Sequence, residues 1–165
     1  MQPGKTGEIV TKGDNVMLGY LDNEEATSEI REGSWQRTGD IGEIDNDGYV
    51  YITDRKKDMI VTGGNNVYPR QIEEVIYENK EIEEACVVGV PDKLWGETVH
   101  LVAVRKTGSL VTETSIMEWS RNLLPTDRRI RSVEFVDSLP KSNYGKILRK
   151  DIRDIVRDRM KKIKN

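Results

Sequence analysis

The sequence changes character at Asp54, and this change limits the folds that the chain can adopt. Before it, short apolar segments such as 7–11 and 41–44 are interrupted by Gly, Asp and Asn, which is typical of strands joined by tight turns. After it, apolar residues recur at helical spacing, as at Ile72 and Ile76. One repeating pattern cannot describe both stretches, so we expect two unlike structural parts.

The second part reads as helix, strand, strand, helix, strand, helix. Ala85–Val90 and Val99–Val104 are apolar runs with the length of buried strands. Pro69 suits the first turn of one helix, and Thr112 is a good N-cap for the next. The last helix is predicted over residues 150–162. A small sheet covered by helices follows from this order.

Apolar stripes predict which face of each helix is buried. The residues assigned to these stripes are Ile72, Val75 and Ile76 in the first helix, Ile116, Trp119 and Leu123 in the second, and Ile152, Ile155 and Val156 in the third. Glu73 is placed on the opposite, solvated face of the first helix.

Charge is also distributed unevenly between the two parts of the sequence. Residues 1–54 hold four Lys/Arg and twelve Asp/Glu, a net charge of −8. The other residues hold 22 Lys/Arg and 17 Asp/Glu, a net charge of +5, so the whole chain carries −3. A basic segment can attract phosphate, nucleic acid or anionic lipid, although a solvated surface is the plainer interpretation.

Composition excludes several classes of protein. The single cysteine, Cys86, rules out a disulfide framework, and the single histidine, His100, rules out a His-rich metal site; both are interpreted as structural core residues. The apolar run 85–90 is far shorter than the roughly 20 residues of a membrane span. With no secretory signal in residues 1–20, we expect a cytoplasmic protein without a membrane span.

The acidic residues between the strands of the first part allow two interpretations. Glu43, Asp45, Asp47 and Asp54 approach the spacing of a calcium loop. The flanking residues alternate with period two, as strands do, so residues 45–48 are predicted to form a hairpin turn instead.

Three local patterns are candidates for ligand binding. Asp40, in Thr-Gly-Asp before a strand, could accept hydrogen bonds from a vicinal diol such as ribose. Gly63-Gly64 could bring backbone close to a ligand, and Lys146, beside a glycine in a polar loop, suits phosphate oxygens. Taken singly, each also fits an ordinary turn or an exposed surface residue.

Together these patterns resemble the adenylate-forming superfamily, which comprises acyl-CoA synthetases, adenylation domains of peptide synthetases and firefly luciferase. The resemblance covers nearly the whole chain and depends on the order of six segments: residues 33–40, 48–60, 63–69, 89–92, 95–97 and 139–146.

The resemblance implies an α+β fold in two parts. Residues 1–54 would be the terminal strands of a large N-terminal domain, 55–57 the hinge, and 58–165 a small C-terminal lid domain with three helices and a small sheet. The phosphate loop and acyl pocket would lie upstream, so we expect the 165-residue chain to be inactive alone.

The resemblance also implies a two-step reaction. A carboxylate attacks the α-phosphate of Mg-ATP and gives acyl-adenylate and pyrophosphate, and the thiol of CoA then displaces AMP. ATP/AMP and CoA would be the ligands, with Mg²⁺ bound mainly by the N-terminal domain.

Site residues are assigned by the same resemblance. Asp40, with Arg55, would bind the ribose hydroxyls of ATP, and Lys146 would be the catalytic residue of the first step. Rotation about Lys57 would then withdraw Lys146 and bring another set of residues toward the thiol tunnel, namely Gly63, Gly64, Gly89 and Pro91.

Two other functions remain to be compared with an acyl-CoA ligase. An adenylation domain would load its acyl or amino acid onto a carrier-protein thiol. A basic nucleic-acid-binding module would need interleaved aromatic residues, which the chain lacks, so we expect no nucleic acid. The expected partners are a carboxylic acid and CoA, and a homo-oligomer is also compatible with the sequence. The acyl substrate cannot be read from these residues, because its pocket would lie in the upstream domain.

Overall fold

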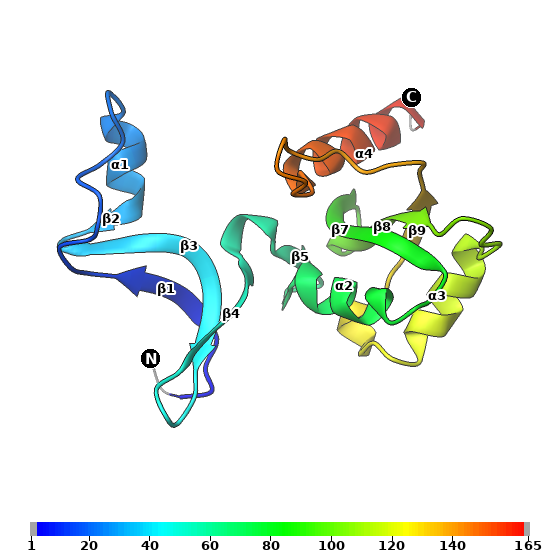
Figure 1. Ribbon diagram of the computed structural model, residues 1–165, viewed down its shortest axis with the longest axis horizontal. Helices are drawn as coiled ribbons and strands as arrows, with labels where there is room; N and C mark the ends of the chain where they lie inside the picture. The colour runs from blue at the N-terminus through cyan, green and yellow to red at the C-terminus, as the bar shows by residue number, and fades with distance from the viewer. Residues whose placement is uncertain (1–2, 164–165) are drawn as a thin grey trace. The chain divides into compact units, whose positions relative to one another are not determined.

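The computed structural model describes residues 3–163, which separate into two compact units with the boundary between Lys57 and Asp58 (Figure 1). In these residues the chain forms two small sheets and four α-helices, so the predicted α+β class is confirmed. None of the described helices is both long and apolar enough to cross a membrane.

The first unit is an antiparallel sheet with one short helix. Its elements are β1 (Gly7–Thr11), α1 (Glu24–Ile30), β2 (Arg31–Glu32), β3 (Trp35–Ile44) and β4 (Val50–Arg55). The longest strand, β3, pairs with β1 along one edge and with β2 and β4 along the other.

The predicted hairpin at residues 45–48 is confirmed. Asp45 Oδ1 accepts hydrogen bonds from the backbone N–H groups of Asp47 and Tyr49, each at 2.9 Å. The flanking elements are strands β3 and β4, whereas a calcium loop of the EF-hand type needs helices. The acidic spacing therefore belongs to a turn.

The second unit is a five-stranded sheet with three α-helices. Its elements are β5 (Ile60–Thr62), β6 (Asn65–Val67), α2 (Pro69–Tyr77), β7 (Ile82–Asp92), β8 (Gly96–Arg105), α3 (Glu113–Arg121), the 3₁₀ turn η2 (Thr126–Arg128), β9 (Ser132–Phe135) and α4 (Arg149–Ile163). The strand order is β6-β5-β8-β7, and β9 pairs with β8 in parallel. The β5–β6 hairpin adds a pair of strands where the sequence predicted only a bend.

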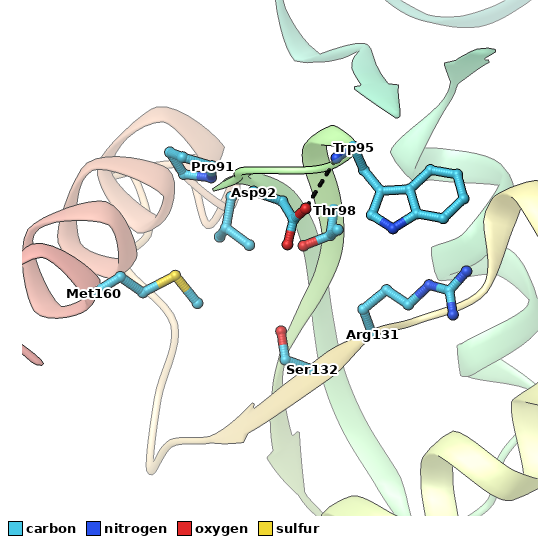
Figure 2. Close-up of a pocket in the computed structure, with 8 residues that line it drawn as sticks. Pro91, Asp92, Trp95, Thr98, Arg131, Ser132 and Met160 are labelled. Atoms are coloured by element: carbon cyan, nitrogen blue, oxygen red, sulfur yellow. Dashed lines mark hydrogen bonds between the residues drawn. The ribbon is translucent and has the colours of Figure 1, made fainter. Parts of the chain in front are cut away.

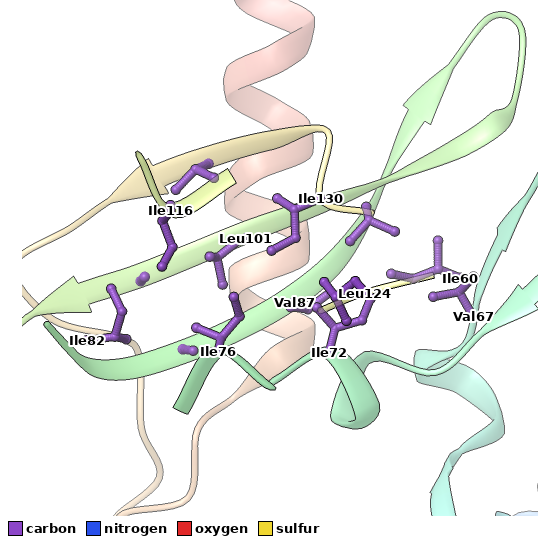
Figure 3. Close-up of a cluster of buried hydrophobic side chains, with 14 residues drawn as sticks. Ile60, Val67, Ile72, Ile76, Ile82, Val87, Leu101, Ile116, Leu124 and Ile130 are labelled. Atoms are coloured by element: carbon purple, nitrogen blue, oxygen red, sulfur yellow. The ribbon is translucent and has the colours of Figure 1, made fainter. Parts of the chain in front are cut away.

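Alternating residues of β7 and β8 face two separate cores. Val87 and Leu101 pack with helices α2 and α3 in a cluster that also contains Ile72, Ile76 and Ile116 (Figure 3). The neighbouring strand residues, including Cys86, Val88 and Val102, pack against Ile152 and Val156 of α4. The sheet is thus covered on both faces, and each fully buried Ile or Leu contributes about 1.5–3 kcal/mol.

Both predicted helix starts are confirmed. Pro69 is the first residue of α2, where its lack of an N–H costs nothing. Thr112 caps α3: its side chain accepts from the Ser115 N–H at 3.2 Å, and Ser115 Oγ accepts from the Thr112 N–H at 2.9 Å.

Three residues lie differently from their predicted positions. Glu73 is buried, because Arg149 from α4 supplies a cationic partner that the pattern of α2 cannot reveal. Ile155 is 42% exposed, since only Ile152 and Val156 of its stripe face the sheet. Leu123 is 49% exposed because α3 ends at Arg121, and Leu124 is buried instead.

Candidate functional site

Asp40 and Arg55 lie opposite each other on the paired strands β3 and β4. Arg55 Nε is 2.8 Å from Asp40 Oδ1, and the Asp40 side chain is 28% exposed. Thr-Gly-Asp was predicted to precede a strand but lies within β3, where the Thr38 hydroxyl accepts a hydrogen bond from the Asp40 N–H at 3.1 Å and donates one to the Ile9 carbonyl at 2.8 Å. The result is a partly exposed carboxylate, held by a cation, that hydroxyl groups could reach.

Lys146 is exposed at the end of a tightly hydrogen-bonded loop before α4. The Ser142 N–H donates to the Lys146 carbonyl at 2.8 Å, and Ser142 Oγ accepts from the Lys146 N–H at 3.2 Å. Lys141, at the other side of the loop, forms an ion pair with Glu84 on β7. The loop thus presents a flexible ammonium group on a backbone that is fixed on both sides.

Gly63 and Gly64 form the turn between β5 and β6. The Gly63 N–H donates to the Trp95 carbonyl at 2.9 Å, and a Cβ at Gly63 would lie 2.6 Å from the indole ring of Trp95. A Cβ at Gly64 would meet open space. Both glycines are exposed, but they differ in packing: only at Gly63 would a side chain clash with Trp95.

Gly89 and Pro91 lie near the end of β7. Gly89 is buried, and a Cβ there would lie 2.9 Å from Glu97 Oε2. The Glu97 carboxylate also accepts from the Val61 N–H at 3.1 Å and pairs with Arg157 of α4 at 2.7 Å. Gly89 thus leaves room for a carboxylate that joins β5, β8 and α4.

Pro91 lines an open pocket of about 480 Å³. The other lining residues are Val90, Asp92, Trp95, Thr98, Arg131, Ser132 and Met160 (Figure 2). The Asp92 carboxylate accepts a hydrogen bond from the backbone N–H of Trp95 at 2.9 Å. The Arg131 guanidinium lies 5.9 Å from the centroid of the Trp95 ring. An aromatic face beside a cation suits a ligand with both a flat ring and negative charge.

Sequence reasoning missed Arg131, Ser132 and Met160 as residues of this pocket. They come from the start of β9 and from α4, far along the chain from Pro91. No sequence signal marks them, because only the folding of β9 beside β8 and of α4 over the sheet brings them there.

Lys57 lies in the 3₁₀ turn η1 (Lys56–Asp58), and its side chain is exposed. The boundary between the two units falls directly after it. Its role as a pivot stays a prediction. The next residue, Asp58, is bound by Arg149 and Arg153 of α4 within the second unit.

His100 and Cys86 are buried in the second unit and do not line the pocket beside Pro91. Burial lowers the pKa of His100 to about 4, and His100 Nδ1 lies 2.7 Å from Ser132 Oγ. Burial raises the pKa of the Cys86 thiol to about 11, so the thiol stays protonated at neutral pH.

The structure brings some predicted site residues together and separates others. Asp40 and Arg55 form one pair in the first unit. In the second unit, Gly63 contacts Trp95, which shares a pocket with Pro91, while Lys146 lies in a different loop. Within residues 3–163 we find no cluster of three His, Cys, Asp or Glu residues that could hold a metal ion.

The fold of the second unit matches a known class, the C-terminal domains of adenylate-forming enzymes. The chain superimposes on the crystal structure of ATP-bound MatB from Rhodopseudomonas palustris with a TM-score of 0.89 and 38% sequence identity, covering 96% of this chain and 32% of MatB. The predicted resemblance to this superfamily is therefore confirmed.

Residues 71–146 match the family model of the AMP-binding enzyme C-terminal domain. The chain is 46% identical over 158 residues to a long-chain-fatty-acid–CoA ligase of Escherichia coli O6:H1, covering 96% of this chain and 28% of the ligase. It is 42% identical over 151 residues to a feruloyl-CoA synthase of Amycolatopsis, covering 92% and 31% respectively. The chain thus spans less than a third of the length of these relatives.

Proposed function

We propose that this chain is the C-terminal part of an AMP-forming acyl-CoA ligase. The complete enzyme would convert a carboxylic acid, ATP and CoA into acyl-CoA, AMP and pyrophosphate through an acyl-adenylate. The observation that carries this proposal is Lys146, an exposed ammonium on a fixed loop in a chain that aligns with an ATP-bound enzyme over 96% of its length.

Lys146 would act in the first step. The substrate carboxylate attacks the α-phosphorus of ATP, and the bond to the pyrophosphate oxygen breaks. Negative charge concentrates between two anionic reactants, and a compact ammonium placed there lowers the barrier electrostatically. Such transfers depend mainly on positioning and charge stabilisation, which a lysine on a fixed loop can supply.

Asp40 and Arg55 would hold the nucleotide. A carboxylate can accept hydrogen bonds from both hydroxyls of a ribose, and the Arg55 contact at 2.8 Å orients the carboxylate for them. Mg²⁺ would neutralise phosphate charge during this step. We assign no residue of this chain to Mg²⁺, because the described residues contain no group of three or more His, Cys, Asp or Glu side chains that could hold a metal ion.

The second step would use other residues of the small unit. Rotation about Lys57 would withdraw Lys146 and bring the turn at Gly63 and Gly64 and the end of β7, with Gly89 buried and Pro91 on the pocket, toward CoA, whose sulfur attacks the acyl carbonyl while AMP leaves. The pocket beside Pro91 supports this assignment, because Trp95 and Arg131 suit a base and a phosphate of CoA.

A carrier-protein thiol is the alternative acceptor. No contact in the described residues favours it over CoA, and both named relatives are CoA enzymes. Those relatives act on a fatty acid and on an aromatic acid, so the proposal leaves the acyl group unassigned.

The complete enzyme with and without Lys146→Ala tests the proposal. Acyl-adenylate formation from ATP with a panel of fatty and aryl acids is measured first, and thioester formation from supplied acyl-adenylate and CoA second. We expect the variant to lose the first activity and largely keep the second. The control is Lys161→Ala, which removes another exposed lysine, on α4. Absence of adenylation by the unaltered enzyme, or equal loss in both steps, would overturn the proposal.

A further inference from the structure

Arg149, the first residue of α4, forms ion pairs with carboxylates on two other elements. Its Nη2 lies 2.6 Å from both oxygens of Glu73 on α2, and its Nη1 lies 3.6 Å from Asp58 Oδ2. The side chains of Glu73 and Asp58 are only 11% and 10% exposed, and that of Arg149 is 20% exposed. Charges this far from water persist only when each is matched by partners in good geometry.

The two carboxylates are themselves fixed by further contacts. Glu73 Oε1 accepts from the Val87 N–H of β7 at 2.7 Å. Asp58 Oδ1 accepts from Arg153 Nη2, one turn further along α4, at 2.8 Å. Arg149 therefore joins α2, β7, α4 and the residue that directly follows Lys57.

Arg149 also lies at the base of the loop that presents Lys146. The two residues are three positions apart in the chain, so their Cα atoms can be at most about 11 Å apart. Between them, the Leu148 N–H donates to the Pro140 carbonyl at 2.9 Å and closes the loop. The end of the loop is thus held by a backbone hydrogen bond and, one residue later, by the buried charge cluster.

We propose that Arg149 is a positioning residue for adenylation: through Glu73 and Asp58 it fixes the base of the Lys146 loop relative to the residue after Lys57. This inference rests on the proposed function, which assigns Lys146 to the first step. A rotation at Lys57 would then move the Lys146 loop as a rigid body, because Asp58 and Arg149 move together. Placement matters for such a group, since a shift of about 1 Å can cost a hundredfold in rate.

Arg149→Gln in the complete enzyme tests the proposal through the two half-reactions. We expect adenylation to fall by about tenfold to a hundredfold, while thioester formation from supplied acyl-adenylate stays within about twofold, because Lys146 does not act there. Arg149→Lys should recover part of the loss, since an ammonium can reach one carboxylate. The matched control is Arg159→Gln, which removes an exposed α4 arginine paired with Glu134.

A double variant separates positioning from general stability. In a Lys146→Ala background, Arg149→Gln should cause no further loss of the residual adenylation, measured in single turnover at high enzyme concentration, because the group that it positions is gone. A purely structural role would instead lower both half-reactions equally, and that result would overturn the proposal, as would an unchanged rate of adenylation. If Arg149→Gln does not fold, Glu73→Gln serves, because it keeps an acceptor for the Val87 N–H and removes the charge.

These outcomes remain distinct from a failure of the proposed function. An unaltered enzyme that forms no acyl-adenylate contradicts the function itself. An unaltered enzyme that does so, with an Arg149 variant that shows no selective loss of adenylation, contradicts only the positioning role.

Discussion

The Tyr77 hydroxyl bridges the backbone of Ala85: it accepts from the Ala85 N–H and donates to the Ala85 carbonyl, each at 3.2 Å. Ala85 lies on β7, which among the described residues pairs only with β8. The Tyr77 side chain thus supplies Ala85 with the two backbone hydrogen bonds that a neighbouring strand would otherwise provide.

Two further side chains continue this pattern along the same strand. The Glu73 carboxylate accepts from the Val87 N–H at 2.7 Å, and Arg157 Nη2 lies 3.4 Å from the Gly89 carbonyl. Residues 85, 87 and 89 alternate along the strand, so these contacts follow one edge of β7. An edge occupied in this way is closed to pairing with another chain.

Tyr77→Phe should therefore destabilise the second unit. The change removes the hydroxyl and leaves two backbone groups without this partner, so we expect a loss of about 1–2 kcal/mol in the free energy of unfolding. Urea denaturation followed by tryptophan fluorescence, to which Trp119 beside the core contributes, measures the loss. Tyr49→Phe is the control, since Tyr49 is 68% exposed, and equal midpoints for the two variants would contradict the prediction.

Gly63→Ala and Gly64→Ala should differ in their effects. Both residues have positive φ, 56° and 83°, so alanine is strained at either position by roughly 1 kcal/mol. Only at Gly63 would the new Cβ also clash with Trp95, at 2.6 Å. We therefore expect a further loss of about 1–3 kcal/mol at Gly63.

Thermal unfolding of the two alanine variants measures this difference, and the emission of Trp95 should shift only in Gly63→Ala. Equal melting temperatures would show that the indole ring moves aside freely.

His100 should make the stability of the second unit depend on pH. Burial lowers its pKa from the ordinary value of 6.5 to about 4 in the folded chain, so the unfolded chain binds more protons between these values. Stability from neutral His100 is fully present above pH 6.5 and decreases as the pH falls toward 4. The shift corresponds to a loss of about 3 kcal/mol.

The groups facing His100 are Ser132, at Nδ1, and Glu134, whose Oε2 lies 3.9 Å from Nε2. His100→Gln removes the titration, so its free energy of unfolding should fall less between pH 7 and pH 4.5. Urea titrations at several pH values give the comparison, and identical slopes for both proteins would show that His100 is not the group responsible.

Local signals in the sequence predicted elements well, whereas contacts between distant residues could not be predicted. Pro69 and Thr112 mark their helix starts through their own backbone chemistry, which needs no distant partner. Glu73 was misplaced because its burial depends on Arg149, 76 residues away. The pocket beside Pro91 depends in the same way on Met160, and the residues next to Met160 in the sequence do not indicate that it lines a pocket.

Lys57→Pro tests whether the backbone at the unit boundary must change conformation during the reaction. Proline fixes φ near −65° and removes the N–H, so it confines residue 57 to a narrow range of backbone angles. If rotation occurs there, the half-reaction that needs the excluded angles should slow by at least about tenfold, as expected when a hinge residue can no longer absorb the change. Lys57→Ala is the matched control, because it removes the same exposed side chain and keeps the backbone free. Separate rates of adenylation and thioester formation decide the question: unchanged rates for the proline variant would place the pivot elsewhere, and equal slowing by alanine would assign the effect to the side chain.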